Sequence, residues 1–137
     1  MYMTASDFAT YPSLEDMPVV VSGGASGIGA QIVREFAAQG SKVGFVDIAD
    51  EQGRALEAEL KAAGQTAKFT RCDITDVDAY QAAIAGFAEA HGPALALVNN
   101  AANDQRHTWQ EVTSEFWDNR LAVNLKHSFF AAQAAPP

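Results

Sequence analysis

The hydrophobic pattern of this chain changes its period several times after residue 17. Short apolar runs indicate buried strands, and each run is followed by a longer stretch with another spacing. In these stretches apolar residues recur every three or four positions, as they do on the buried face of a helix. The expected strands cover residues 19–21, 42–46, 66–71 and 95–98. The expected helices cover residues 27–39, 51–63, 75–90 and 114–134.

Strands that alternate with helices in this way predict an α/β fold with a parallel sheet and helices on both faces. Because right-handed crossovers leave few topologies, we expect a doubly wound, Rossmann-type sheet with strand order 3-2-1-4. Residues 1–17 are polar and show no period, so we interpret them as an N-terminal arm that precedes the domain. Thr75 is expected to cap the third helix, with Asp76 and Asp78 in its first turn.

Composition and charge narrow the class of partner. The 137 residues are 48% hydrophobic, so the chain can bury a core. A formal net charge of -8 disfavours nucleic acid and anionic membranes as partners, because both require a basic face. No basic residue precedes Arg34, and no stretch approaches the ~18 apolar residues of a membrane span, so we expect a cytoplasmic protein. Cys72 is the only cysteine, which allows neither an internal disulfide nor a cysteine metal cluster.

The segment Ser22–Gly29, SGGASGIG, joins the first expected strand to the first helix. Glycine lets the backbone adopt positive φ and approach a ligand closely. A helix that begins near Gly27 adds unpaired N–H groups and a partial positive charge, and these features together suit a pyrophosphate. A tight turn rich in small residues is the alternative, and the glycines alone do not decide between the two.

Polar side chains follow at the ends of the next three expected strands. Asp47 can accept hydrogen bonds from both ribose hydroxyls of an adenosine, and its charge repels a 2′-phosphate, so it favours NAD over NADP. No Lys or Arg lies next to it in the sequence; its alternative role is to end the strand or cap the next helix. Asp73 can meet an adenine edge or cap the following helix. The amides within Asn99–Ala102 can bridge strand ends and hold a ribose, or form a plain turn.

Four features in order resemble the short-chain dehydrogenase/reductase family: Gly23-x-x-x-Gly27-x-Gly29, Asp73, Asn99-Asn100-Ala101 and Val123-Asn124-Leu125. The resemblance covers residues 18–135. It implies that residues 18–137 are the first four βα units of a dinucleotide-binding Rossmann domain whose C-terminal half is absent. The family usually has Thr where Ser22 stands and Gly where Ala102 stands. The residues expected to hold NAD are Ser22, Gly23, Ser26, Gly27, Ile28, Gly29, Asp47, Asp73, Asn100, Ala101 and Ala102.

A closer similarity points to bacterial NAD-dependent D-xylose and related aldose 1-dehydrogenases. The segments that carry it are Tyr11–Leu14, Asp47–Asp50, Asn103–His107 and Trp117–Arg120. The similarity implies hydride transfer from the C1 hydroxyl of an aldose, or from a similar alcohol, to NAD. By family resemblance we also expect a homo-oligomer, a dimer or a tetramer. Asn103 and Asp104 are candidate sugar contacts; His107 is a third, with an exposed loop histidine as the alternative.

The catalytic residues of the family are Asn, Ser, Tyr and Lys, and Asn124 matches the first of them. No tyrosine of this chain has a lysine four positions later: Tyr2, Tyr11 and Tyr80 are followed there by Ser6, Glu15 and Ile84. We therefore expect the 137 residues alone to be inactive. A non-catalytic nucleotide-binding or interaction module is the alternative function. No residue is assigned to a metal.

Overall fold

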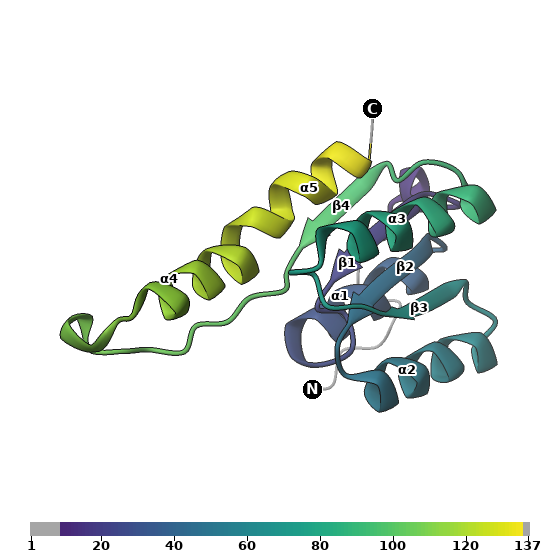
Figure 1. The fold of residues 1–137 in the computed structure, drawn as a ribbon. Helices are drawn as coiled ribbons and strands as arrows, with labels where there is room; N and C mark the ends of the chain where they lie inside the picture. Colours follow the sequence, from purple (N-terminus) through teal and green to yellow (C-terminus); the bar gives the residue numbers. More distant parts are fainter. Residues whose placement is uncertain (1–8, 136–137) are drawn as a thin grey trace, which may run out of the picture.

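A computed structural model of the chain describes residues 9–135 and shows a sheet with helices on both faces (Figure 1). Four parallel strands lie in the order β3-β2-β1-β4. This is the predicted order. The strands are β1 (Pro18–Ser22), β2 (Lys42–Asp47), β3 (Ala67–Arg71) and β4 (Ala96–Asn99).

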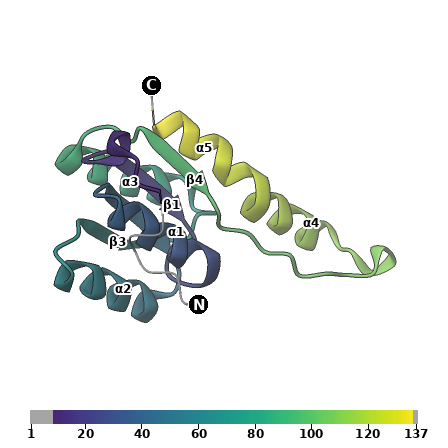
Figure 2. The ribbon, with the colours of Figure 1, turned by 180° about the vertical axis from the view of Figure 1, so that it is seen from behind.

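Five α-helices connect and cover the strands in the described part of the chain. They are α1 (Gly27–Ala38), α2 (Asp50–Ala62), α3 (Val77–His91), α4 (Ser114–Leu121) and α5 (His127–Ala134). Buried apolar side chains form two clusters. One cluster joins α1 and α2 to one face of the sheet, and the other joins α3 and α5 to the opposite face. Figure 2 shows the same layers from behind. No helix among residues 9–135 is long and apolar enough to cross a membrane.

The central strand β1 supplies side chains to both cores, because successive residues of a strand point to opposite faces. Val19 and Val21 belong to the cluster beneath α1 and α2, whereas Val20 belongs to the cluster beneath α3 and α5. All five residues of β1 are buried. β4 pairs only with β1 in the described structure, and Ala96, Leu97 and Val98 are half-buried. A central apolar strand therefore anchors the domain.

The predicted cap of the third helix was wrong. The Asp76 carboxylate caps α3 by accepting a hydrogen bond from the backbone N–H of Ala79 at 3.0 Å. Thr75 lies one residue too early, and its hydroxyl donates to Asp73 Oδ1 at 2.7 Å instead. The fourth strand also begins one residue later than predicted, at Ala96.

The last predicted helix contains an irregular segment that hydrophobic spacing did not reveal. A π-helical segment, Ala122–Lys126, separates α4 from α5 without interrupting the helical run. In Figures 1 and 2, α4 and the loop before it extend away from the layered body. The segment between β4 and α4 is exposed along most of its length, so few other residues of the described chain pack against it.

The described part of the N-terminal arm, residues 9–17, is fixed to the edge of the domain. Its single 3₁₀ turn spans Pro12–Leu14. The Ser41 hydroxyl donates to the carbonyl of Leu14 at 2.7 Å, and the N–H of Lys42 donates to the carbonyl of Met17 at 2.9 Å. Residues 1–8 of the predicted arm lie outside the described residues.

Two helix glycines provide a matched test of this packing. A Cβ added to Gly53 in α2 would overlap the ring of Phe69, whereas a Cβ added to Gly86 in α3 would meet no atom within 4 Å. We predict that Gly53→Ala lowers the free energy of unfolding by about 1–3 kcal/mol through overpacking. Gly86→Ala should raise it by up to about 1 kcal/mol, because alanine favours a helix. Urea unfolding at one protein concentration measures both, and effects of equal sign would contradict the packing.

Candidate functional site

A cavity of about 540 Å³ lies at the carboxyl ends of the parallel strands. Ligands of open α/β sheets commonly bind at this edge. The walls come from the glycine-rich loop after β1, the turns after β2 and β3, the segment after β4, and the α4 helix with its π-helical continuation. The lining residues are Gly23, Ser26, Ile28, Gly29, Asp47, Ile48, Cys72, Asp73, Ile74, Thr75, Asn100, Ala101, Ala102, Asn103, Asn119 and Val123.

The glycine-rich loop depends on close packing as well as on backbone freedom. Gly23 and Gly27 have φ of +67° and +54°, which glycine adopts without strain. A Cβ on Gly29 would overlap the carbonyl oxygen of Gly23 and lie 2.6 Å from Asn100 Nδ2. Glycine at position 29 is therefore required by the loop itself, before any ligand is considered.

The first turn of α1 faces the cavity with unpaired backbone donors. Ser26 is the N-cap residue, and its side chain makes no capping hydrogen bond. Within residues 9–135, no acceptor is described for the N–H groups of Gly27, Ile28 and Gly29. Ile28 is 77% exposed, so this helix end is open to solvent. Unpaired N–H groups at a helix N-terminus form a favourable environment for an anion.

Asp47 joins the glycine-rich loop to the turn that follows β2. Its Oδ2 atom accepts a hydrogen bond from the N–H of Ala25, and its Oδ1 atom accepts one from Ala49, both at 3.0 Å. Each carboxylate oxygen keeps a second lone pair for another donor. The strand register places Arg71 opposite Asp47, a basic neighbour in space that is absent from the local sequence. No ion pair between them is formed in the described structure.

Asp73 holds the turn before α3. Its Oδ1 atom accepts hydrogen bonds from the N–H of Thr75 at 2.9 Å and from the Thr75 hydroxyl at 2.7 Å. The hydrogen bonds described for its carboxylate all use Oδ1. Cys72, directly before it, is 6% exposed, and burial together with Asp73 and Asp76 raises the pKa of its thiol. The turn thus places a carboxylate and a protonated thiol in the cavity wall.

Ser22 and Asn100 connect the ends of β1 and β4, and we call this pair the strand-end clamp. The Ser22 hydroxyl accepts hydrogen bonds from the N–H groups of Asn100 and Ala101, both at 3.1 Å. Asn100 Nδ2 donates to the carbonyls of Ser22 at 3.1 Å and Gly23 at 3.0 Å. Ser22 is fully buried, so its side chain supports the cavity wall from behind instead of lining it.

Asn124 lies in the π-helical segment and binds the backbone of Asn103. Its Oδ1 atom accepts from the N–H of Asn103 at 2.8 Å, and its Nδ2 atom donates to the carbonyl of Asn103 at 3.0 Å. Asn103 lines the cavity, whereas Asn124 does not. Asp104 and His107 are exposed beyond the cavity, and His107 stacks on Phe116 with ring centroids 4.4 Å apart.

The described tyrosines are poorly placed to accept a proton. Tyr80 is fully buried, and burial raises its pKa to about 12, so it keeps its proton at neutral pH. Tyr11 lies on the N-terminal arm and is 57% exposed. Neither tyrosine lines the cavity.

The cavity also contains residues that the sequence did not indicate. Ile48 and Ile74 each follow a predicted aspartate, so the repeated Asp-Ile pair after β2 and β3 was an available signal. Asn119 and Val123 come from α4 and the π-helical segment. Both lie in segments that carry the family resemblance, Trp117–Arg120 and Val123–Leu125, but neither was assigned to the site. Their place in the wall depends on how the last helical run crosses the cavity.

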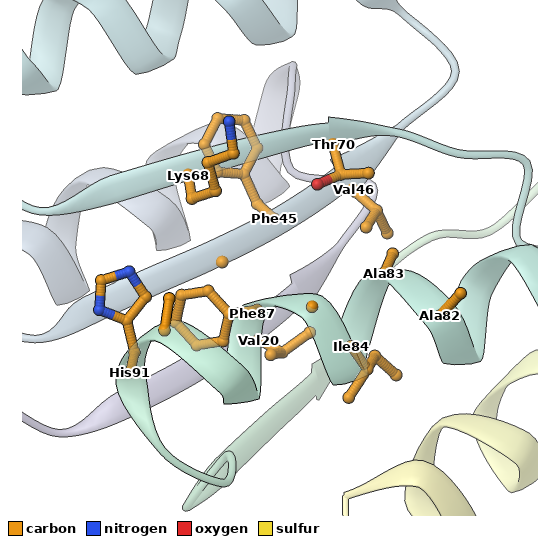
Figure 3. Close-up of a pocket in the computed structure, with 13 residues that line it drawn as sticks. Val20, Phe45, Val46, Lys68, Thr70, Ala82, Ala83, Ile84, Phe87 and His91 are labelled. Atoms are coloured by element: carbon orange, nitrogen blue, oxygen red, sulfur yellow. The ribbon is translucent and has the colours of Figure 1, made fainter.

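A second cavity, of about 370 Å³, lies between α3 and the outer part of the sheet (Figure 3). Its polar lining side chains are Lys68, Thr70 and His91; the other lining residues are apolar or glycine. Lys68 and His91 lie toward one end of this cavity, and Thr70 toward the other. None of the site residues predicted from the sequence lines it.

The strand order and the site at the carboxyl ends of the strands define a Rossmann-like α/β protein. The family model of the short chain dehydrogenases matches residues 18–137. The chain therefore belongs to the short-chain dehydrogenase family of oxidoreductases, whose members use NAD(P).

Two curated relatives are sugar dehydrogenases by name. D-xylose 1-dehydrogenase of Caulobacter vibrioides is 49% identical over 129 residues, which cover 94% of this chain and 50% of the relative. A probable galactose dehydrogenase of Rhizobium meliloti is 46% identical over 128 residues, which cover 93% of this chain and 50% of the relative. The chain thus spans about half the length of these relatives.

Solved structures show the same architecture. A Serratia marcescens short-chain dehydrogenase/reductase variant aligns with a TM-score of 0.86 and 32% identity, over 91% of this chain and 51% of that one. A blue fluorescent protein from a metagenomic library, solved with NADPH, aligns with a TM-score of 0.85 and 33% identity, over 89% of this chain and 51% of that one.

Proposed function

We propose that this chain forms the dinucleotide-binding half of an NAD-dependent dehydrogenase that oxidises the C1 hydroxyl of an aldose. The observation that carries the proposal is the convergence of the glycine-rich loop, Asp47 and the segment after β4 on one cavity. These three features come from separate parts of the chain and meet at the carboxyl edge of the sheet. The names of the two sugar dehydrogenase relatives support the substrate class.

In this proposal NAD lies across the carboxyl edge of the sheet. The pyrophosphate is bound by the unpaired N–H groups at the start of α1, and Asp47 accepts hydrogen bonds from the adenosine ribose. Asp73 lies toward the adenine, and Ala101 and Ala102 lie toward the nicotinamide. Bound NAD supplies the hydride acceptor. The strand-end clamp keeps the glycine-rich loop and the nicotinamide side of the cavity at a fixed separation.

The preference for NAD over NADP rests on charge. A 2′-phosphate beside Asp47 would place two negative groups together in a protein of net charge -8. Arg71 is the basic residue nearest in the strand register, but it does not line the cavity. One solved relative contains NADPH, so the fold also accepts a cofactor with a 2′-phosphate. The charge around the ribose must therefore decide between NAD and NADP.

Sugar contacts are proposed for Asn103 and Asp104, with His107 farther out. Asn124 fixes the backbone of Asn103 through two hydrogen bonds, which orders the start of this segment. The 137 residues contain no Tyr-x-x-x-Lys, the motif that removes the hydroxyl proton in this family. We therefore propose that these residues bind the dinucleotide and do not oxidise a sugar by themselves.

The function is tested with two samples: the 137-residue chain, and the full-length protein as its gene encodes it. We predict that both bind NAD in isothermal titration calorimetry and that the full-length protein reduces NAD with D-xylose or D-galactose. The 137-residue chain should show no sustained NADH formation, because general-base catalysis contributes about 10²–10⁴-fold. A full-length protein that binds NAD but oxidises no aldose or alcohol would support the non-catalytic module instead.

The cofactor preference has its own test. Asp47→Ala is predicted to reduce the ratio of NAD to NADP affinity by about ten-fold, because one unfavourable charge contact is removed from the NADP complex. Dissociation constants for both cofactors measure the ratio. Arg71→Ala is the matched control, since it removes the neighbouring charge outside the cavity and should not favour NADP. A native protein that prefers NADP would contradict the assignment.

We also propose that the protein associates with itself through the last helical run. Exposed apolar side chains recur every fourth residue there: Trp117, Leu121, Leu125 and Phe129 are 59%, 42%, 64% and 68% exposed. We call these four residues the apolar stripe. Phe116 and Phe130, the other two phenylalanines of this helical run, are half-buried. A contiguous apolar surface of this kind favours association.

Leu125→Arg is predicted to shift the protein to a smaller species, because it places a charge in the middle of the apolar stripe. Sedimentation velocity of the full-length protein measures the change. Ala55→Arg, an exposed position on α2, is the control and should leave the assembly intact. Identical sedimentation of Leu125→Arg and the native protein would exclude the apolar stripe as the interface.

A further inference from the structure

Asn119 lines the cavity beside Asn103 and is exposed, although neither the glycine motif nor the strand-end amides indicate it. Arg120 donates a hydrogen bond from Nη2 to Asn119 Oδ1 at 2.8 Å. A guanidinium group has donors and no acceptor, so the oxygen of the Asn119 amide must face Arg120. The other branch of the planar amide, Nδ2, then points away from Arg120. Within residues 9–135 no hydrogen bond is described for this Nδ2 group.

Arg120 is itself fixed by several contacts. Its guanidinium carbon lies 4.9 Å from the ring centroid of Phe116, within the range of a cation–π interaction. Its Nη1 atom donates to the carbonyl of Asn103 at 3.4 Å. That carbonyl also accepts a hydrogen bond from Asn124, so Arg120 and Asn124 both hold the backbone of Asn103 in place. The Phe116 ring and the Asn103 carbonyl hold the guanidinium of Arg120, and Arg120 in turn fixes the orientation of the Asn119 amide.

We propose that Asn119 donates an Nδ2 hydrogen bond to a hydroxyl oxygen of the sugar, and that Arg120 is the residue that positions it. This inference rests on the proposed function and adds a specificity-determining group to it. The ligand class is a neutral polyhydroxylated substrate with an acceptor oxygen away from the oxidised carbon. Asn119 lies on α4 and is linked through Arg120 to Asn103, which follows β4. Asp47 ends β2, which lies on the other side of β1 from β4, so we place Asn119 near the substrate and not near the adenosine.

An uncharged donor suits discrimination between sugars. A site that hydrogen-bonds a hydroxyl group disfavours an analogue without that group, because the protein donor then loses its partner. With Oδ1 occupied by Arg120, Asn119 offers only a donor to the cavity. A substrate oxygen in this position must therefore act as an acceptor, as a hydroxyl oxygen can.

The test uses the full-length protein, NAD, D-xylose and its 2-, 3- and 4-deoxy analogues. We expect Asn119→Ala to lower kcat/KM for D-xylose about ten-fold, mainly through KM, with an unchanged dissociation constant for NAD. For the one deoxy analogue that lacks the bonded oxygen, the native protein and Asn119→Ala should have equal kcat/KM. Asn119→Asp, similar in shape but without the donor, should behave like Asn119→Ala.

Arg120→Lys tests the positioning role. Lysine keeps the charge but lacks the planar fork that binds Asn119 and Asn103 together. We expect it to weaken D-xylose turnover and to abolish the same deoxy discrimination, with unchanged NAD affinity. A loss of kcat/KM that is equal for every analogue, or any loss of NAD affinity, would overturn the inference. Native turnover with no effect of Asn119→Ala would overturn this inference alone, whereas a full-length protein without sugar oxidation would overturn the proposed function with it.

Discussion

The hydroxyl of Ser22 and the side-chain amide of Asn100 join the ends of β1 and β4, and the carboxyl edge of the sheet depends on this strand-end clamp. Ser22 is fully buried, so its hydrogen bonds form away from competing water. Asn100 also holds the carbonyl of Gly23, where the glycine-rich loop begins. A Cβ at Gly29 would enter the same space. The shape of the loop and the position of the segment after β4 therefore depend on the same contacts.

From the strand-end clamp outward, four polar residues of the cavity wall are held by hydrogen bonds within the chain. Asp47 is hydrogen-bonded to two backbone N–H groups, and Asp73 to the turn at Thr75. Asn103 is supported by Asn124, and Asn119 by Arg120. Such support keeps polar groups oriented before a ligand arrives, which reduces the ordering cost of binding. In the proposed function, Asp47 and Asp73 are held in this way on the adenosine side, and Asn103 and Asn119 on the sugar side.

Much of the fold was predictable, because strand and helix periods differ and the alternation from β1 to α3 is regular. The predicted strand order was confirmed, and the family resemblance carried by the four motifs was confirmed by the family model, which matches residues 18–137. Local chemistry at the ends of elements was less predictable. Thr75 and Asp76 are both acceptable caps by composition, and a shift of one residue decided between them. The π-helical segment keeps the apolar spacing of a helix, so the sequence pattern did not reveal it.

By itself, the sequence determined which segments alternate as strands and helices and which polar residues end the strands, because both depend on neighbours along the chain. Tertiary structure decided which of those residues share a surface. It buried Ser22 behind the cavity, placed Arg71 opposite Asp47, and brought Asn119 to the cavity wall. These outcomes depend on strand register and on the path of the last helical run, which are set by contacts between residues far apart in the sequence.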